Sequence, residues 1–419
     1  MTSRMLTLVP TPPKSLGDYA AVVGADAVAR LRERAARFKG ARVLNINSTA
    51  FGGGVAELLY TLVPLMRDLG IDAEWRLIQA PDEFFVVTKA MHNALQGGSV
   101  PWTSEMQSLY TSVSEDNAEA FDEASYDFVI VHDSQPAALL PELVEDRGSK
   151  SGRWIWRCHI DLTAPYEPVW EFVKPIVENY DAAIFTLPDF VQPGLDITHV
   201  AIIPPSIDPL AIKNIPMDGG MVDEVMRRYL IDTTRPIVVQ VSRFDPWKDP
   251  LGVIDAFRIA RKEVPGLQLA LIASMAHDDP EGWEYYTKTE EYRQDDSDIF
   301  LLSNLNDVGA LGVNAFQRAA DVVVQKSIRE GFGLVVAEAM WKGKPVIGSD
   351  VGGIRLQIID GETGYLVDDV DGCAKRIVDV LADREEATEM GRVARAFVKE
   401  RFLSTRDIDD HLALFEALS

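Results

Sequence analysis

The chain has 419 residues, of which 41 are Lys or Arg and 65 are Asp or Glu, so its formal net charge is −24 with His neutral. This length is enough for about two or three domains, each large enough to bury a core without disulfides or metal ions. The acidic balance argues against a protein that coats nucleic acid phosphates or binds an anionic membrane, because no broad basic field exists to attract either.

Two cysteines, Cys158 and Cys373, lie far apart in the sequence and in no metal-binding or redox spacing, which is typical of a reducing compartment. The first 14 residues contain no apolar core of signal-peptide length, and no stretch approaches the roughly 18 apolar residues of a membrane span. We therefore expect a cytoplasmic protein whose partners are small molecules, with neither nucleic acid nor membrane among them.

Short runs of β-branched and aromatic residues alternate with longer amphipathic segments, which is the pattern of βα units. The first set of predicted strands covers residues 42–47, 73–78, 126–132, 154–159, 181–187 and 199–203. After Pro204 and Pro205 a second set follows, at residues 236–242, 267–274, 299–303, 321–325, 345–348 and 364–367. Runs such as IVVQVS are apolar on both faces, as parallel strands buried between two helix layers are.

Two doubly wound α/β domains, each with its own parallel sheet, fit this pattern better than one large sheet. We predict a first Rossmann-like domain over residues 1–210 and a second over residues 217–403, joined by a Pro-rich hinge at about residues 204–216. Helices are expected at residues 384–401 and 404–418, and the segment 404–419 is expected to join the first domain. The polar stretch 98–124 fits either a helical insertion or a mobile segment. Because such sheets bind ligands at the carboxyl ends of their strands, a cleft between the two domains is the expected site.

Three glycines, Gly52, Gly53 and Gly54, separate the first predicted strand from an apolar helix in the segment NSTAFGGGVAELL. Glycines let the backbone approach a ligand closely, and the free amides at a helix start favour an anionic group. The spacing is neither the dinucleotide fingerprint nor a P-loop. A plain tight turn between a strand and a helix would give the same pattern.

The segment SIREGFGLVVAEAM follows the predicted strand 321–325, and its two glutamates, Glu330 and Glu338, are separated by seven residues. The start of the following helix would aim its unpaired N–H groups at negative charge, and Glu338 could accept hydrogen bonds from a diol. This pattern predicts a nucleotide pocket; the alternative is an acidic helix start with a solvated glutamate. The residues at the helix start are Gly331, Phe332, Gly333, Leu334 and Val335.

Arg243 and Lys248 lie five residues apart in RFDPWK, directly after the predicted strand 236–242. Two cations on a loop at a strand end can clamp a diphosphate, although surface salt bridges would explain them equally. Both this loop and the Glu330 loop leave strands of the same predicted sheet, so they can converge.

Polar side chains also end two strands of the first domain. His132 and Asp133 end one of them, and the segment RCHID, which contains His159 and Asp161, ends the next. A histidine at a strand end can bind sugar hydroxyls or stabilise charge near a reacting carbon, but it can also be structural. No close ligand spacing accompanies these residues, so we predict no zinc site.

The EGFGLVVAE segment with RFDPWK before it resembles the retaining glycosyltransferases with two Rossmann-like domains, the glycosyltransferase family 4 type with the GT-B fold. More narrowly, the chain resembles the trehalose glycosyltransferring synthases, over matches spread from about residue 45 to residue 362. That branch also contains trehalose phosphorylases. The segments that carry this narrower resemblance are NSTAFGGGVAELL, PDEFFVVTKAMHNALQG, WRCHIDLT, PPSIDPL, RFDPWKD, MAHDDPEGW and VNAFQRAADVVVQKSIREGFGL.

The resemblance implies transfer of glucose from UDP-glucose or ADP-glucose to free glucose, giving α,α-trehalose with retained configuration. By that similarity, Arg243 and Lys248 hold the diphosphate, Glu338 the ribose, and Glu330 the donor glucose near its anomeric carbon. The glycine loop 52–54 approaches the donor and closes the cleft. The stretch LNDVGALG at residues 305–312 is less polar than expected near the base, so the preferred base stays open.

His159 is expected, from the same resemblance, at the hydroxymethyl group of the donor sugar. The acceptor side is assigned to the predicted ligands His132, Asp133, Lys89, Asn93 and Asp161. No cofactor is required by this scheme; Mg²⁺ can screen the diphosphate, but no metal site is predicted. Relatives of this kind suggest a homodimer.

Front-face substitution is the predicted mechanism, with the leaving phosphate taking the proton of the acceptor, because no second carboxylate is placed as a nucleophile opposite Glu330. The main alternative function is a trehalose phosphorylase, which uses phosphate in place of the nucleoside diphosphate. A non-catalytic nucleotide-sugar sensor is an alternative of a different class. A nucleotide-sugar epimerase shares the predicted architecture, but the first-domain motifs speak against it.

Overall fold

The computed structural model describes residues 6–51, 53–121, 125–275 and 280–419. Gly52 of the glycine loop and part of the MAHDDPEGW motif therefore lie outside the described residues. The chain forms two compact units, the first made of Met1–Pro205 with Ser404–Ser419 and the second of Ser206–Leu403. These units differ from the predicted 1–210 and 217–403, because the connection 206–216 belongs to the second unit, where Asn314 and Arg318 donate to its backbone carbonyls.

The first unit is built on a seven-stranded sheet in the order β1-β3-β2-β4-β5-β6-β7, in which only β1 is antiparallel to its neighbour. Its strands are β1 (Thr7–Leu8), β2 (Arg42–Asn47), β3 (Asp72–Leu77), β4 (Phe128–His132), β5 (Arg153–Arg157), β6 (Ala182–Phe185) and β7 (His199–Ile202). Every strand predicted for this half is present, and the sequence analysis missed only β1. That strand has two exposed residues and therefore no apolar run to reveal it.

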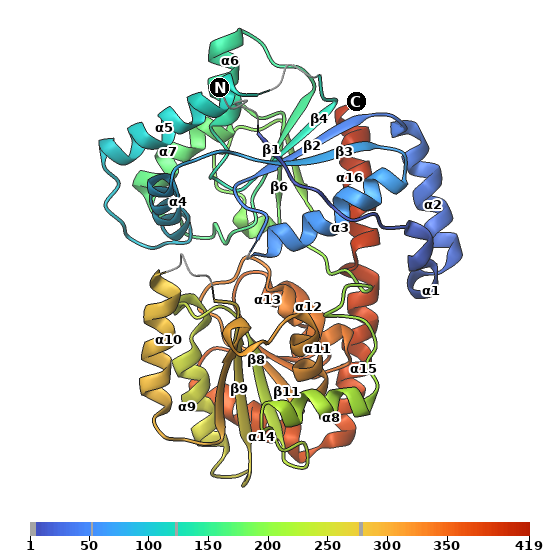
Figure 1. The fold of residues 1–419 in the computed structure, drawn as a ribbon, viewed down its shortest axis with the longest axis vertical. Helices are drawn as coiled ribbons and strands as arrows, with labels where there is room; N and C mark the ends of the chain where they lie inside the picture. The colour runs from blue at the N-terminus through green and yellow to red at the C-terminus, as the bar shows by residue number, and fades with distance from the viewer. Residues whose placement is uncertain (1–5, 52, 122–124, 276–279) are drawn as a thin grey trace. The chain divides into compact units, whose positions relative to one another are not determined.

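Helices cover both faces of this sheet, as the upper half of Figure 1 shows. They are α1 (Ala20–Val23), α2 (Ala25–Ala35), α3 (Gly54–Asp68), α4 (Asp82–Leu95), α5 (Ser104–Glu119), α6 (Leu139–Arg147), α7 (Glu167–Val177) and α16 (Ser404–Leu418), with short 3-10 helices at Leu16–Tyr19, Ala36–Phe38 and Pro188–Phe190. The polar stretch that fitted two interpretations contains α5, whose first turn is capped by the Thr103 hydroxyl accepting from the Met106 amide. The helical alternative is therefore the correct one for that segment.

The last helix, α16, belongs to the first unit although it follows the whole of the second in sequence. The Phe415 ring on α16 stacks on Phe128 of β4 at 4.2 Å between centroids and lies edge-on to Phe38 at 5.9 Å. Arg34 of α2 holds the outer face of the same helix through Asp409 and Glu416, at 2.9 and 3.0 Å. Apolar packing on one face and ion pairs on the other thus fix α16 against the sheet.

The second unit is a six-stranded parallel sheet in the order β10-β9-β8-β11-β12-β13. Its strands are β8 (Ile237–Val241), β9 (Gln268–Ala273), β10 (Ile299–Ser303), β11 (Val322–Gln325), β12 (Val346–Ser349) and β13 (Tyr365–Val367). Taken along the chain this order is 3-2-1-4-5-6, the dinucleotide-binding arrangement, which confirms the doubly wound prediction. The strand order reverses between β8 and β11, where such sheets bind ligands.

Helices again flank the second sheet (Figure 1). They are α8 (Gly219–Arg228), α9 (Pro250–Ala260), α10 (Pro280–Arg293), α11 (Ala310–Ala319), α12 (Leu334–Trp341), α13 (Ile354–Gln357), α14 (Val370–Ala382) and α15 (Arg384–Arg401), with short 3-10 helices at Pro246–Lys248 and Asn304–Asn306. The core of this unit is formed by the fully buried faces of its strands with α9 and α14.

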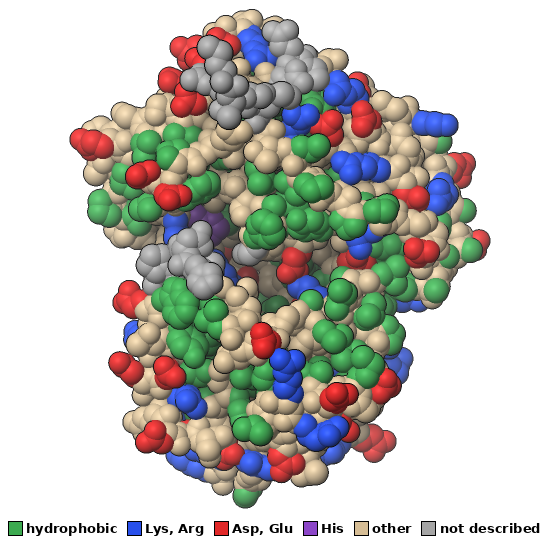
Figure 2. All heavy atoms as spheres, viewed as in Figure 1, with side chains coloured by type: hydrophobic (Ala, Val, Ile, Leu, Met, Phe, Trp, Pro, Cys, Tyr) green, Lys and Arg blue, Asp and Glu red, His purple; other side chains and the backbone are tan. Residues whose placement is uncertain are grey.

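Acidic and basic side chains are interspersed over the face drawn in Figure 2, and neither unit gathers its cations there into a broad basic region. No helix within the described ranges combines the length and the apolarity that crossing a bilayer demands.

Candidate active site

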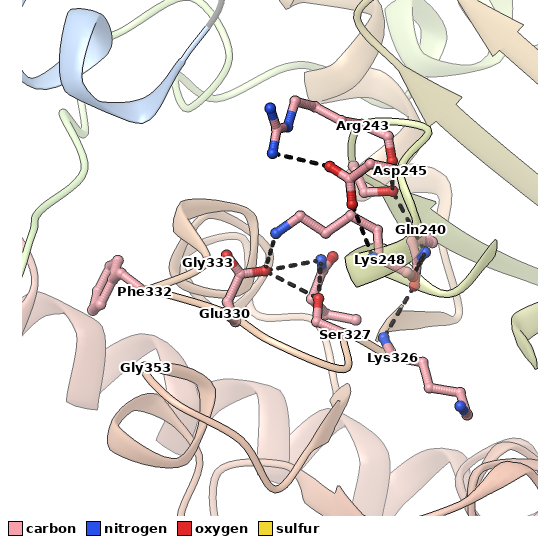
Figure 3. Close-up of polar contacts among 12 residues, drawn as sticks. Gln240, Arg243, Asp245, Lys248, Lys326, Ser327, Glu330, Phe332, Gly333 and Gly353 are labelled. Atoms are coloured by element: carbon pink, nitrogen blue, oxygen red, sulfur yellow. Dashed lines mark hydrogen bonds and ion pairs between the residues drawn. The ribbon is translucent and has the colours of Figure 1, made fainter. Parts of the chain in front are cut away.

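The loop after β8 carries the two predicted diphosphate ligands and a carboxylate between them (Figure 3). Asp245 caps the 3-10 helix Pro246–Lys248 by accepting from the Lys248 amide at 3.1 Å, and its other oxygen pairs with Arg243 at 2.9 Å. Burial raises the pKa of Asp245, although Arg243 and Lys248 act in the opposite direction. Arg243 is half exposed, with 52% of its side chain accessible. Its guanidinium is therefore available to a ligand.

Glu330, in the loop after β11, accepts hydrogen bonds from side chains of both this loop and the loop after β8. Its Oε2 atom accepts from Lys248 Nζ at 2.7 Å and from the Ser327 hydroxyl at 3.0 Å. Gln325 Nε2 approaches the same oxygen at 3.4 Å. Figure 3 shows the Lys248 and Ser327 side chains pointing at this carboxylate. The structure thus brings the loops after β8 and β11 together, as their shared sheet predicted.

Two glycines make room for the Glu330 loop. Gly333 has φ +82°, a conformation that favours glycine, and a Cβ there would lie 3.1 Å from Glu330 Cγ, so Glu330 would have to shift slightly. A Cβ on Gly353 would lie 2.3 Å from Phe332 Cα, so the turn after β12 packs directly on the loop backbone. The Gly353 amide also donates to the Glu330 carbonyl at 3.0 Å.

Gln357, on α13, is a residue that the sequence analysis missed. It is fully buried, and its Nε2 donates to the carbonyls of Phe332 at 2.5 Å and of Gly333 and Gly353 at 3.3 Å. One amide therefore joins α13, the turn after β12 and the Glu330 loop. A lone glutamine in a short helix carries no spacing signal that could have indicated this.

Glu338, the predicted ribose ligand, lies on α12 with only 1% of its side chain exposed. Its Oε1 pairs with Lys213 Nζ at 2.7 Å, and its Oε2 is buried without a hydrogen-bond partner in the described structure. The solvated-glutamate alternative is therefore wrong. Because Lys213 lies against the carboxylate, a diol reaches Glu338 only if the lysine side chain shifts or shares the contact.

Two lysines, Lys213 and Lys342, lie close to Glu338. Lys342 Nζ donates to Asn214 Oδ1 at 2.9 Å and to the Glu338 carbonyl at 3.2 Å. Burial lowers the pKa of Lys342 to about 7, against the attraction of Glu338. The sequence analysis did not predict Lys213 as a site residue, because it is a single cation in the Pro-rich connection with no motif around it.

The amides of Leu334 and Val335 lie in the first turn of α12, where no intrahelical acceptor exists for them. They follow Gly331, Phe332 and Gly333, so the backbone N–H groups of this segment start beside the Glu330 carboxylate. Such a helix start favours an anionic group.

In the first unit, the glycine loop leaves β2 and enters α3 at Gly54. Gly53 precedes α3 with φ −167°, an extended conformation open to any residue, and a Cβ there would meet nothing within 4 Å. The backbone conformation at Gly53 therefore does not require glycine. The open space beside its Cα would let a ligand approach the backbone closely. Phe51, before it, is 79% exposed.

His132 and His159, which end β4 and follow β5, lie side by side. Their rings stack with centroids 5.2 Å apart, and His132 Nδ1 lies 2.9 Å from His159 Nε2. The other His132 nitrogen, Nε2, lies 3.1 Å from Asn45 Oδ1. Burial, followed by the nearby Arg157 charge, lowers the pKa of both histidines well below its usual range.

Asp133 has φ +63° and accepts from the His159 amide at 2.8 Å, so it fixes the loop that carries that histidine. Burial raises the pKa of Asp133 to about 7, although the amide hydrogen bond and Arg157 act in the opposite direction. The Trp156 indole also donates to the Asp133 carbonyl at 2.9 Å.

The remaining predicted acceptor ligands lie on α4 and in the segment after β5. Lys89 and Asn93 lie on α4, one turn apart, and both are partly exposed. Asp161 is buried and accepts from the amide and hydroxyl of Thr163 at 2.9 and 2.5 Å, which closes a local turn. The Tyr166 amide donates to the Ala94 carbonyl at 2.8 Å, which ties the end of α4 to the segment after Asp161. Their contacts with a sugar stay a prediction.

Across the described ranges, no group of three or more His, Cys, Asp or Glu side chains is placed to hold a metal ion.

Comparison with known proteins decides the family. The family described as "Trehalose synthase, N-terminal domain" matches residues 45–192, and "Glycosyl transferases group 1" matches residues 221–397. A trehalose synthase from Pyrococcus horikoshii is 48% identical over 97% of this chain and 97% of its own length. The chain belongs to the trehalose synthase family. A second trehalose synthase, from Rubrobacter xylanophilus, is 48% identical over 99% of both chains.

One more distant relative and one solved structure are also similar to the chain. A trehalose phosphorylase from Pleurotus pulmonarius is 28% identical over 92% of this chain and 58% of its own length. The solved structure of a UDP-forming α,α-trehalose-phosphate synthase from Burkholderia xenovorans, in complex with glucose-6-phosphate, is 15% identical. It has a TM-score of 0.72 and covers 90% of this chain and all of its own. The chain is thus a glycosyltransferase enzyme with the GT-B fold, as its motifs predicted.

Proposed function

We propose that this trehalose synthase family member makes α,α-trehalose by transferring glucose from UDP-glucose or ADP-glucose to free glucose, with retention at the anomeric carbon. The observation that carries the proposal is the convergence of Arg243, Lys248 and Glu330 at the carboxyl ends of β8 and β11, beside the start of α12. This is the point where the strand order reverses, and it combines cations, free amides and a carboxylate. The trehalose synthases that are 48% identical support the choice of sugar.

Leaving-group stabilisation is the main catalytic effect in this proposal. Breaking the bond from the anomeric carbon to phosphate places growing negative charge on the nucleoside diphosphate. Arg243 and Lys248 would neutralise that charge, and Lys248 would do so where little water is present, since its side chain is only 14% exposed. The amides at the start of α12 would add fixed dipoles that need no reorganisation during the reaction.

Glu330 is better suited to orient the donor glucose than to attack it. Lys248, Ser327 and Gln325 all donate to its Oε2, so the charge is held by three hydrogen bonds, which weakens the carboxylate as a nucleophile. Oε1 has no protein partner within the described part of the chain and can accept from a sugar hydroxyl. This arrangement supports front-face substitution. The acceptor oxygen bonds to the anomeric carbon as the phosphate departs, and its proton passes to that phosphate.

The nucleotide ribose is assigned to Glu338. The buried and unpartnered Oε2 is an acceptor that a ribose hydroxyl can satisfy, with Lys213 either displaced or sharing the carboxylate. The diphosphate site requires no cofactor in this proposal, and Mg²⁺ would act only by screening phosphate charge.

The first unit is assigned to the sugars. His159 would contact the hydroxymethyl group of the donor glucose, while Asp133, Lys89, Asn93 and Asp161 would act on the acceptor side. The open space at Gly53 would let the backbone approach the donor.

Product analysis tests the proposal. The protein is incubated with glucose and either UDP-glucose or ADP-glucose, and the products are identified by proton NMR. We expect α,α-trehalose together with the free nucleoside diphosphate from at least one donor. Free glucose as the sole product of the donor, or no turnover with either nucleotide, would contradict it. A Lys248→Ala preparation made in parallel excludes a contaminating enzyme.

Trehalose phosphorylase activity is the second candidate, since a phosphorylase is 28% identical over 92% of this chain. Incubating trehalose with phosphate would then give glucose 1-phosphate, whereas the proposed synthase gives a sugar nucleotide from trehalose and a nucleoside diphosphate. Separate incubations with the two anions decide between the activities.

A further inference from the structure

The contacts of the His132 and His159 rings determine where their protons lie. Asn45, on β2, is 3% exposed, and its Nδ2 donates to the Glu74 carbonyl at 3.4 Å, which turns its Oδ1 toward His132. An amide oxygen can only accept, so the His132 nitrogen that faces it, Nε2, must carry a proton. The opposite tautomer would place two lone pairs against each other at 3.1 Å.

The proton position on His132 determines the proton position on His159. A neutral imidazole has one protonated and one unprotonated nitrogen, so His132 Nδ1 is an acceptor. His159 Nε2, 2.9 Å away, must then donate to it, and His159 Nδ1 is left without a proton. Both rings are neutral near pH 7, because burial and then Arg157 hold the pKa of each well below its usual range. Within the described ranges no protein group pairs with His159 Nδ1.

We propose that Asn45 and His132 are positioning residues that fix the tautomer of His159, so that its Nδ1 is a hydrogen-bond acceptor for a hydroxyl group of the bound sugar. Since both His132 nitrogens are used by the protein, His132 acts through His159 rather than as the acceptor ligand that the sequence suggested. The proposal rests on the proposed function for the identity of that hydroxyl, the 6-hydroxyl of the donor glucose. The proton positions follow from the contacts alone.

NMR tests the proton positions without any substrate. Long-range ¹H–¹⁵N correlation of protein labelled at histidine distinguishes the protonated from the unprotonated ring nitrogen, and loss of signals in His159→Gln and His132→Gln assigns the two rings. We expect the proton on Nε2 in both rings of the parent protein. A proton on His159 Nδ1 would overturn the proposal.

A donor that lacks the hydroxyl tests the consequence for catalysis. With the parent protein, the 6-deoxyglucose nucleotide should have a kcat/KM roughly threefold to tenfold below that of the natural donor, the usual value of one neutral hydrogen bond. In Asn45→Leu the oxygen that fixes His132 is lost, so the two donors should become equal within about twofold. Asn45→Asp keeps an acceptor oxygen and should keep the parent ratio of the two donors. An unchanged ratio in Asn45→Leu would contradict the proposal.

Asn117→Leu is the matched control, because Asn117 is also 3% exposed and in the first unit, but it bonds Gln79 rather than a histidine. It should lower stability without changing either the NMR signals of His159 or the donor ratio. If the parent makes no trehalose from either sugar nucleotide, the proposed function fails, while the NMR result still decides the tautomer.

Discussion

Lys248 is the residue on which leaving-group stabilisation depends most, because its ammonium is both partly buried and fixed by Glu330. Replacing it by Ala should lower kcat by roughly a hundredfold or more, the usual loss when one contact to developing charge is removed. Steady-state kinetics with the preferred sugar nucleotide measures this. Turnover equal to that of the parent would remove Lys248 from the mechanism.

Lys326→Met is the matched control for that variant. Lys326 lies in the neighbouring loop, is 9% exposed and pairs with Asp249, and Figure 3 shows its side chain pointing away from Glu330. Its loss should affect stability more than turnover, whereas Lys248→Ala should leave the circular dichroism spectrum and thermal unfolding close to those of the parent.

Asp133 gives a pH dependence with a definite sign. Its pKa is raised to about 7 by burial, above the usual 3.8, so the folded state binds more protons than the unfolded state between these values. The stability of the parent relative to Asp133→Asn should therefore fall as pH rises from about 4 to 7, by at most about 1.4 kcal/mol per unit, and level off above that. Thermal unfolding of both proteins at several pH values measures the difference. A difference that grows with pH would contradict the assignment.

The sequence predicted which residues belong to the site better than it predicted which side chains contact one another. Arg243, Lys248 and Glu330 stand out because they follow strands of one sheet, and the structure joins them. Asn45, Lys213 and Gln357 do not, because each is a single polar residue whose partners lie far away in sequence. Only the folded backbone shows that these side chains meet the site.

At the scale of elements, the strand ends are the parts that carry chemistry, and the apolar runs of the sequence predicted nearly all of them. The conformations of the loops after those strands could not be predicted in the same way. The Glu330 loop is shaped by Gln357 and Gly353, which belong to the next strand-to-helix unit. Its geometry therefore depends on packing between units of the sheet rather than on its own residues.

Gln357→Leu should loosen that loop, since three carbonyls lose their donor while the buried volume stays similar. We expect a loss of stability of about 1 to 3 kcal/mol together with weaker binding of the nucleoside diphosphate. Urea unfolding and isothermal titration calorimetry measure the two effects. Gln268→Leu is the control, because Gln268 is equally buried but its side-chain amide hydrogen-bonds with the Asp232 backbone. Gln268 begins β9, at the amino end of the strand, whereas the site loops follow the carboxyl ends of β8 and β11. If both variants bind the nucleotide equally well, Gln357 has no special role.

At the scale of the whole molecule, the chain leaves the first unit at Pro205 and returns to it at Ser404. The 384–401 and 404–418 helices follow from periodicity and match α15 and α16 in extent. What periodicity cannot show is the partner of an apolar face, and for α16 that partner is the first sheet, through Phe415 and Phe128.

Phe415→Ala tests how far the two units depend on each other. Losing a fully buried ring from the core of the first unit should cost about 3 to 5 kcal/mol of stability. The affinity for the nucleoside diphosphate, measured by calorimetry at a temperature where the variant is folded, should stay within a few-fold of the parent value, because its proposed ligands all lie in the second unit. A large loss of affinity would show that the nucleotide site depends on the first unit.

The central claim is that the second unit neutralises a departing diphosphate at the ends of β8 and β11. A crystal structure of the full-length protein with a nucleoside diphosphate tests it most directly. The claim predicts phosphate oxygens within hydrogen-bond distance of Arg243 and Lys248, with the ribose against Glu338 and Lys213 displaced or sharing the contact. A diphosphate bound elsewhere, with both cations left in their present ion pairs, would contradict it.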